Sequence, residues 1–339
     1  MNDYLNHIKQ LVVVLVFVLS FSCKNKNGNI QTKMDSVAVN ISTGELSMKI
    51  AKEPANPELY YQRSVVYFNE KNFEKSLQDI DQAISYNKQN PLYFYIKGNI
   101  LFSMNETLKS AQAYESSIKL KPDYTEALLK ASELYFIVKE HQKSFYYLNT
   151  IISKDPTNAN AHFFKGMNFK ELKDTAKAIQ EFQSAYENDK YFYDAAIQLG
   201  LIYSTRNDKM AAEYFTAAIN IQPRNEEAYF ARGVYYQNIQ KYTEALMDYR
   251  KVIAFNPSKF EAYYNVGYIN FDTKHFDDAI RNFDFCIQMN NNYPQAYYMR
   301  GLTEEIRGNK EKAKVNYEYV LQFDPNFELA KEALKRVIK

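Results

Sequence analysis

Apolar and polar residues follow one another along most of this chain with the spacing that places the apolar ones on one face of an α-helix. Within residues 260–293, Ala279, Phe283 and Ile287 are spaced i, i+4 and i+8. Earlier in the same stretch, Tyr263 and Val266 also stand at helical offsets. The pattern predicts two consecutive helices in this stretch.

The same helix pair recurs with a period of 34 residues, marked by a small residue at one position of each repeat. These small residues are Ser64, Gly98, Ser132, Gly166, Gly200, Gly233, Gly267 and Gly301. The step from 200 to 233 is one residue shorter, which indicates a deletion in the loop around Asn207 and Asp208. A fixed period of this length is typical of a solenoid, in which each repeat buries its apolar face against its neighbours. We expect eight repeats over residues 57–327, which begin at residues 57, 91, 125, 159, 193, 226, 260 and 294.

A second small residue lies twelve positions after the first, as in Ala245, Ala279 and Ala313. A glycine inside a helix costs about 1 kcal/mol relative to alanine, so helix propensity alone would remove the glycines. We therefore expect a packing reason. The missing side chain would let the first helix of each repeat approach the second, whose own small residue faces it.

Prolines mark the ends of the predicted helices. One group falls just past the second helix, where a residue without an N–H stops it. This group comprises Pro122, Pro156, Pro223, Pro257 and Pro325. Pro54 lies at the same position ahead of the first repeat, so residues 42–56 are predicted to form an N-terminal capping helix with Leu46 and Ile50 pointing inward. Residues 328–339 are its C-terminal counterpart.

The order of large and small residues in each repeat resembles the tetratricopeptide repeat (TPR) family over residues 57–327. In the sixth repeat the pattern is carried by Tyr229, Gly233, Tyr236, Ala245, Tyr249, Val252 and Pro257. The first aromatic of the family is usually tryptophan, which this chain lacks. The resemblance implies an all-α fold, a right-handed α-solenoid of helix-turn-helix units with terminal capping helices.

The N-terminus carries a predicted export signal. Residues 11–19, LVVVLVFVL, form an apolar run about half as long as a bilayer-spanning helix requires, and Ser22 and Cys23 follow soon after. A small residue directly before a lone early cysteine resembles a bacterial lipoprotein signal, which implies that residues 1–22 are removed and that Cys23 is acylated. A plain cleaved signal and an uncleaved anchor are the alternatives.

Residues 23–41 are rich in Asn, Lys, Ser and Gly and show no helical period, so we interpret them as a flexible tether. Together with the lipid on Cys23, this tether would hold the repeats close to a membrane. The segment after Cys23 lacks the acidic cluster of a surface-export signal. We therefore expect an outer membrane lipoprotein of a Gram-negative bacterium that faces the periplasm.

The sequence shows no sign of catalytic chemistry. The four histidines are scattered, and the chain has no HExxH, GxSxG, CxxC or glycine-rich phosphate loop. We expect no metal, no cofactor, no small-molecule substrate and no enzymatic activity. The 42 Lys and Arg nearly balance the 40 Asp and Glu, which argues against nucleic-acid binding. Cys286, the other cysteine, lies where the repeat favours a small buried residue.

In the TPR family, positions 2, 5, 9 and 12 of the first helices usually contact ligands, counted from the first residue of each repeat. Position 5 is apolar or aromatic here: Tyr61, Tyr95, Leu129, Phe163, Ile197, Phe230, Tyr264 and Tyr298. Position 2 is acidic in five repeats, through Glu58, Glu126, Asp194, Glu227 and Glu261. Positions 2 and 5 lack the basic residues that grip a peptide carboxylate in some TPR proteins. We expect a partner segment with hydrophobic anchors and basic flanks, and the alternative is that position 5 only packs neighbouring helices together.

The predicted function is a non-enzymatic protein–protein interaction scaffold, lipid-anchored in the bacterial envelope, which binds other proteins or peptide segments in a concave groove. Two other functions are consistent with the sequence. The chain could be a permanent structural or assembly subunit of an envelope machine for secretion, gliding, pilus formation or outer-membrane insertion. It could also be a regulatory adaptor of cell-wall enzymes.

Overall fold

The computed structural model describes residues 42–338, and every regular element in that range is an α-helix. These residues form two compact units, an N-terminal unit that ends at Leu120 and a C-terminal unit that begins at Lys121. The predicted signal, the predicted lipid attachment residue Cys23 and the predicted tether lie outside the described residues.

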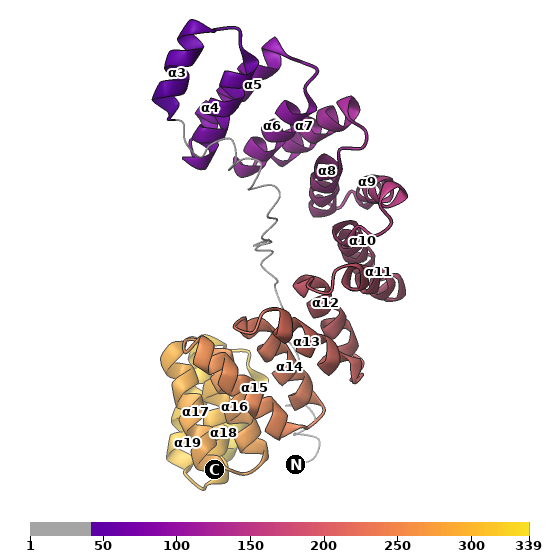
Figure 1. Ribbon diagram of the computed structural model, residues 1–339. Helices are drawn as coiled ribbons and strands as arrows, with labels where there is room; N and C mark the ends of the chain where they lie inside the picture. Colours follow the sequence, from indigo (N-terminus) through magenta and orange to yellow (C-terminus); the bar gives the residue numbers. More distant parts are fainter. Residues whose placement is uncertain (1–41, 339) are drawn as a thin grey trace. The chain divides into compact units, whose positions relative to one another are not determined.

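The N-terminal unit contains one capping helix and the first two repeats (Figure 1). Its helices are α3 (Thr43–Lys52), α4 (Pro57–Asn69), α5 (Phe73–Tyr86), α6 (Pro91–Ser103) and α7 (Thr107–Leu120). Each helix packs against the next one in the sequence. The first turn of α3 is closed by a capping box between Ser42 and Glu45, and Leu46 and Ile50 are buried as expected.

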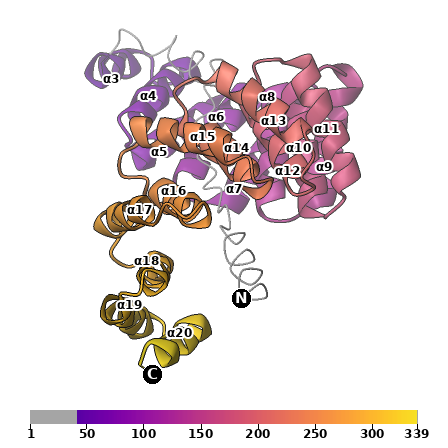
Figure 2. The same cartoon turned by 90° about the horizontal axis from the view of Figure 1, so that it is seen from below.

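The C-terminal unit contains the other six repeats and a last helix. Its helices are α8 (Thr125–Ile137), α9 (His141–Lys154), α10 (Ala159–Glu171), α11 (Thr175–Asn188), α12 (Tyr193–Ser204), α13 (Met210–Ile221), α14 (Glu226–Asn238), α15 (Tyr242–Phe255), α16 (Phe260–Asp272), α17 (Phe276–Met289), α18 (Pro294–Ile306), α19 (Lys310–Phe323) and α20 (Glu328–Ile338). Figure 2 shows the pairs α16/α17 and α18/α19 following one another, with α20 at the end. The outer residues of α20 include Glu332, Lys335 and Arg336, so the stack ends in a polar surface.

The turn between the two helices of a repeat is the same in all eight repeats. Position 15 has a positive φ, between +52° and +83°. The residues at this position are Lys71, Asn105, Lys139, Lys173, Asn207, Gln240, Lys274 and Gly308. The next N–H then donates to a carbonyl five residues back, as Glu140 does to Tyr135 at 2.8 Å, which closes a Schellman motif. This left-handed residue ends the first helix, although only one of the eight is glycine.

The repeat glycines lie directly against an aromatic ring. A Cβ added to any of the six would come within 3.0 Å of a ring carbon at position 24 of the same repeat, or at position 23 in the shortened fifth repeat. At Gly166 the distances to three successive carbons of Phe182 would be 2.7, 2.7 and 3.1 Å, which places the glycine over the ring face. The second small residue does lie near the first, since Ser110 Oγ donates to the carbonyl of Gly98 at 2.7 Å. The ring, however, is what excludes a side chain at the glycine, and the expectation of two facing small residues did not include this contact.

The two repeats that have serine instead of glycine also lack the ring. Ser64 is matched by Ile80 at position 24, and Ser132 is matched by Leu148. All four side chains are fully buried. Because Ile and Leu are smaller and shorter than Phe and Tyr, they leave room for a serine Cβ. Helix separation therefore depends on the sum of two side chains, a small one on the first helix and its partner on the second.

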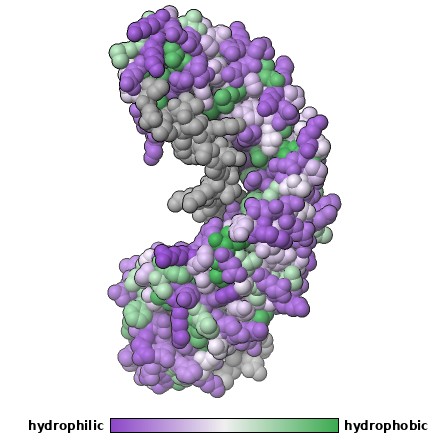
Figure 3. All heavy atoms as spheres, viewed as in Figure 1, coloured by the Kyte–Doolittle hydropathy of each residue, from purple (hydrophilic) through white to green (hydrophobic). Residues whose placement is uncertain are grey.

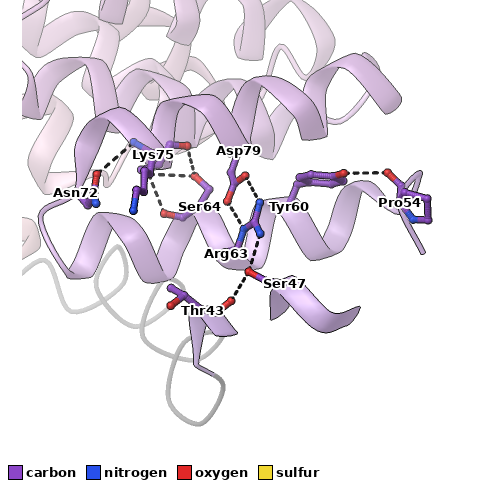
Figure 4. Close-up of polar contacts among 10 residues, drawn as sticks. Thr43, Ser47, Pro54, Tyr60, Arg63, Ser64, Asn72, Lys75 and Asp79 are labelled. Atoms are coloured by element: carbon purple, nitrogen blue, oxygen red, sulfur yellow. Dashed lines mark hydrogen bonds and ion pairs between the residues drawn. The ribbon is translucent and has the colours of Figure 1, made fainter. Parts of the chain in front are cut away.

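A partly buried ion pair links the helices of the first and sixth repeats, and Figure 4 shows the pair of the first repeat. Arg63 on α4 donates to both carboxylate oxygens of Asp79 on α5, at 2.7 and 2.8 Å, and its third nitrogen donates to Ser47 on α3 at 2.8 Å. In the sixth repeat Arg232 bonds Asp248 and the preceding Thr216 in the same way. Each arginine thus joins three successive helices, with the two-pronged geometry that guanidinium and carboxylate groups allow.

The expected fold class is confirmed. Each unit is an all-α stack of helix-turn-helix repeats, with α3 and α20 as the terminal capping helices. In the fifth repeat, which carries the deletion, the second helix is shorter. Helix α13 has 12 residues, whereas the other second helices have 14.

The contact between Gly166 and Phe182 predicts that a glycine-to-alanine change lowers stability at this position, which is the opposite of the effect of helix propensity. Gly166→Ala should destabilise the chain by about 1–3 kcal/mol through overpacking, although helix propensity alone would favour alanine by about 1 kcal/mol. In a Phe182→Leu background the same change should cost much less. Chemical unfolding followed by circular dichroism would measure both values.

Gly44→Ala is the matched control, because a Cβ there would meet only Ser42 Oγ at 3.8 Å. This change should leave stability unchanged or raise it. An equal cost of Gly166→Ala with and without Phe182 would show that the ring is not the cause.

Candidate protein-binding face

The first helices of the repeats line one side of the C-terminal unit. In Figure 1, α8 and α10 lie on the inner side of its curve, with α9 and α11 outside. First helices of successive repeats also contact each other directly, α8 with α10, α12 with α14 and α16 with α18. Positions 2, 5, 9 and 12 therefore come from helices that lie next to one another.

The position-5 side chains are mostly buried. Seven of the eight are no more than 7% exposed, namely Tyr61, Tyr95, Phe163, Ile197, Phe230, Tyr264 and Tyr298. Leu129 is partly exposed. Their surroundings are shown by Tyr264, whose ring centroid lies 5.9 Å from that of Phe283 and 5.3 Å from that of Tyr293, the last residue of the repeat. Tyr264 thus packs between the position-24 ring and the last residue of its own repeat.

These side chains stabilise the stack, and contact with a partner remains a prediction for them. On the face drawn in Figure 3, hydrophilic residues cover most of the described surface and hydrophobic ones form small separate patches. Because seven of the eight position-5 side chains are buried, they form no continuous exposed aromatic strip among the described residues. A ligand would meet the rims of these side chains and the polar residues around them.

Three acidic residues at position 2 occupy successive first helices, Asp194 on α12, Glu227 on α14 and Glu261 on α16. We refer to these three residues as the acidic edge. Tyr193 donates its hydroxyl to Glu227 Oε2 at 3.3 Å, and Lys259 lies 3.6 Å from Glu261. Of the other two acidic residues at position 2, Glu58 lies in the N-terminal unit and Glu126 lies on α8.

The electrostatics of the acidic edge are unfavourable in the isolated chain. Burial raises the pKa of Asp194, and no described residue forms an ion pair with its carboxylate. Burial is also the main reason that the pKa of Glu227 is raised, and the nearby charge of Asp194 adds to it. A partly buried carboxylate without a cation costs stability. A cationic group on a partner would offset this cost.

Lys170 was not singled out by the sequence, yet it lies on the first helix α10 at position 12. Its Nζ donates to Gln198 Oε1 on α12 at 2.6 Å, and burial lowers its pKa. The signal that could have revealed it is a lysine at a position that holds phenylalanine in four repeats, at Phe68, Phe102, Phe136 and Phe271. The inner side of the C-terminal unit therefore carries charges of both signs.

No group of three or more His, Cys, Asp and Glu side chains among residues 42–338 is arranged to hold a metal ion. No helix in this part of the chain is long and apolar enough to span a membrane. Cys286 is fully buried, and burial raises the pKa of its thiol to about 12. The thiol therefore stays protonated and packs as a small apolar group.

Asp194→Asn should stabilise the chain near neutral pH. A carboxyl whose pKa is raised by folding holds its proton more tightly in the folded state. Its contribution is therefore most favourable in acid and is lost as the pH rises through the ordinary carboxyl range. We expect a rise in Tm of about 1–3 °C at pH 7 that vanishes near pH 3.5.

Glu318→Gln, on the exposed side of α19, is the matched control and should leave Tm unchanged. A lower Tm for Asp194→Asn at pH 7 would mean that the charged carboxylate stabilises the fold.

Comparisons with known proteins agree with this architecture. The tetratricopeptide repeat profile matches residues 57–90, 92–124, 260–293 and 294–327, and a second TPR repeat profile matches residues 239–274. Among solved structures, a TPR protein from Parabacteroides merdae aligns over 84% of this chain and 99% of its own, with a TM-score of 0.51 and 18% identity. The C-terminal part of a TPR repeat-containing protein from Cytophaga hutchinsonii aligns over 71% and 99%, with a TM-score of 0.61 and 17% identity.

One curated relative is the BBSome complex member BBS4 of Bos taurus. It is 25% identical over 231 residues, which cover 58% of this chain and 44% of the relative. The chain thus matches less than half of this relative's length. The repeat profiles, the helix pairs and the solved structures agree, and the chain is a member of the tetratricopeptide repeat family.

Proposed function

We propose that this chain is a non-enzymatic scaffold that binds other proteins through the inner side of its first helices. The partner would be a segment with basic residues flanking hydrophobic anchors. The basic residues would lie against the acidic edge, and the anchors would meet the rims of the position-5 side chains. No nucleic acid, cofactor or small-molecule substrate takes part in the proposed function.

The observation that supports this proposal is the uncompensated carboxylate of Asp194 beside Glu227. A fold that only had to be stable would gain by replacing Asp194 with a neutral residue. Lysine or arginine from a partner would restore the lost solvation, and complementary charge also speeds association and selects partners. The destabilising charge therefore favours a binding role over a purely structural one.

We further propose that the scaffold is anchored by acylation of Cys23 to the outer membrane of a Gram-negative bacterium and faces the periplasm. The support is the apolar run at residues 11–19 with the small residue ahead of the cysteine. A tether of about 18 residues spans on the order of 25 Å as a random coil. Confinement to this distance from the lipid would raise the effective concentration of membrane-associated partners.

A permanent role as a subunit of an envelope assembly is the second candidate. It is favoured by the relative BBS4, which is named as a member of a complex. Such a subunit would co-purify with its partners in fixed stoichiometry. A transient scaffold would lose them on dilution.

The acidic edge predicts a charge-dependent partner set. Chemical cross-linking in cells followed by mass spectrometry should recover about tenfold less partner with the double variant Glu227→Lys and Glu261→Lys, because reversing two charges creates repulsion toward basic residues. Glu318→Lys reverses an exposed charge on α19 and should leave the recovered set unchanged. Equal recovery with all three proteins would contradict the proposed binding face.

The proposed anchor predicts that a fatty-acid analogue labels the wild-type protein in cells. Cys23→Ala should abolish the label and release the protein from the membrane fraction, whereas Cys286→Ala should keep both. Labelling that persists in Cys23→Ala would refute the anchor without affecting the proposed binding face.

A further inference from the structure

The first and sixth repeats share a polar arrangement at the junction of their two helices. In the sixth, Arg232 at position 7 donates two N–H groups to Asp248 at position 23, at 2.8 and 2.7 Å. Tyr229 at position 4 donates its hydroxyl to the carbonyl of Pro223 in the preceding turn, at 3.3 Å. The first repeat repeats these contacts with Arg63, Asp79, Tyr60 and Pro54. Every acceptor in the arrangement has a permanent donor.

The fourth repeat builds the same junction from different residues. Lys165 replaces the arginine, Glu181 replaces the aspartate and His162 replaces the tyrosine. Lys165 Nζ lies 2.9 Å from Glu181 Oε1, so it covers one carboxylate oxygen. His162 Nδ1 lies 2.7 Å from Glu181 Oε2, and His162 Nε2 lies 2.9 Å from the carbonyl oxygen of Pro156. The imidazole thus takes over both the second prong of the arginine and the hydroxyl of the tyrosine.

Both neighbours of the ring can only accept a hydrogen bond, since one is a carboxylate and the other a backbone carbonyl. A neutral imidazole has a single N–H, so it can satisfy only one of them. The doubly protonated imidazolium satisfies both. The side chains of His162 and Glu181 are 13% and 11% exposed, so water is largely excluded as a substitute donor to Glu181, whereas the Pro156 carbonyl lies in an exposed turn.

The charges around the ring favour the cation. The charged groups that face His162 are Glu181 on α11, Lys165 on its own helix α10 and Asp155 in the turn between α9 and α10. Hydrogen bonds from Thr157 and Asn158 are the main causes that lower the pKa of Asp155, and the positive charge of His162 adds to them. With the imidazolium present, two cations balance two carboxylates.

We propose that His162 makes the fourth repeat a pH-sensitive joint, closed when the imidazole is doubly protonated and loosened when it is neutral. The folded state holds the second proton through Glu181 and Pro156, whereas the unfolded chain does not. The stabilisation is therefore present while the imidazole is doubly protonated, and it is lost as the pH rises and the second proton leaves. This regulation goes beyond the proposed scaffold function and does not depend on it.

Thermal melts of the full chain and of His162→Tyr at pH 5.5 and pH 8 test the joint. Tyrosine restores the arrangement of the first and sixth repeats at position 4 and does not titrate in this range. We expect the wild type to lose about 2–4 °C in Tm relative to the variant between the two pH values. Parallel pH dependence of the two proteins would overturn the proposal.

A measurement on the wild type keeps the proposal falsifiable if the variant fails to fold. Nitrogen-15 NMR of the imidazoles reports whether each ring nitrogen carries a proton, and the exposed His275 is the internal control. Because an acceptor faces each ring nitrogen of His162, both of its nitrogens should keep their protons to a higher pH than those of His275. Loss of a proton from His162 at the same pH as from His275, or at a lower pH, would overturn the joint.

Discussion

The close approach of two helices at a glycine and an aromatic ring is the constraint on which the rest of the structure depends. It fixes the distance between the helices of a repeat, and the ring in turn supports the position-5 side chain, as Phe283 supports Tyr264. The serine repeats obey the same constraint with smaller partners, as Ser64 with Ile80 and Ser132 with Leu148 show. Packing of this density explains why glycine persists inside a helix despite its unfavourable propensity.

The fold could be predicted from the sequence because the 34-residue period is visible in single residue types. Small residues, prolines and apolar stripes each recur in register, and together they specify the helix pairs and both capping helices. The contacts that depend on two positions at once could not be predicted from the sequence. The match between position 8 and position 24 and the ion pair between Arg63 and Asp79 are of this kind. The left-handed turn residue was also hidden, because lysine at Lys139 or Lys173 gives no local sign of a positive φ.

The candidate binding face was only partly accessible from the sequence. An apolar residue at position 5 has the same appearance whether it packs or binds, and the structure buries seven of the eight. The acidic residues were visible, but their energetic meaning depends on burial and on the absence of a cation near Asp194 among the described residues. Burial and pairing are properties of neighbouring helices, so no local pattern reports them. Position 5 thus stabilises the stack, and the proposed binding role belongs mainly to the acidic residues at position 2.

The most direct test of the central claim is the chemical shift of the glycine α-protons in solution NMR. A proton held over an aromatic ring face is shifted upfield by the ring current. The α-protons of Gly98, Gly166, Gly200, Gly233, Gly267 and Gly301 should all be displaced upfield relative to those of Gly44, which faces no ring. Shifts for the six that match those of Gly44 would mean that the rings do not lie on the glycines, and this account of the stack would be wrong.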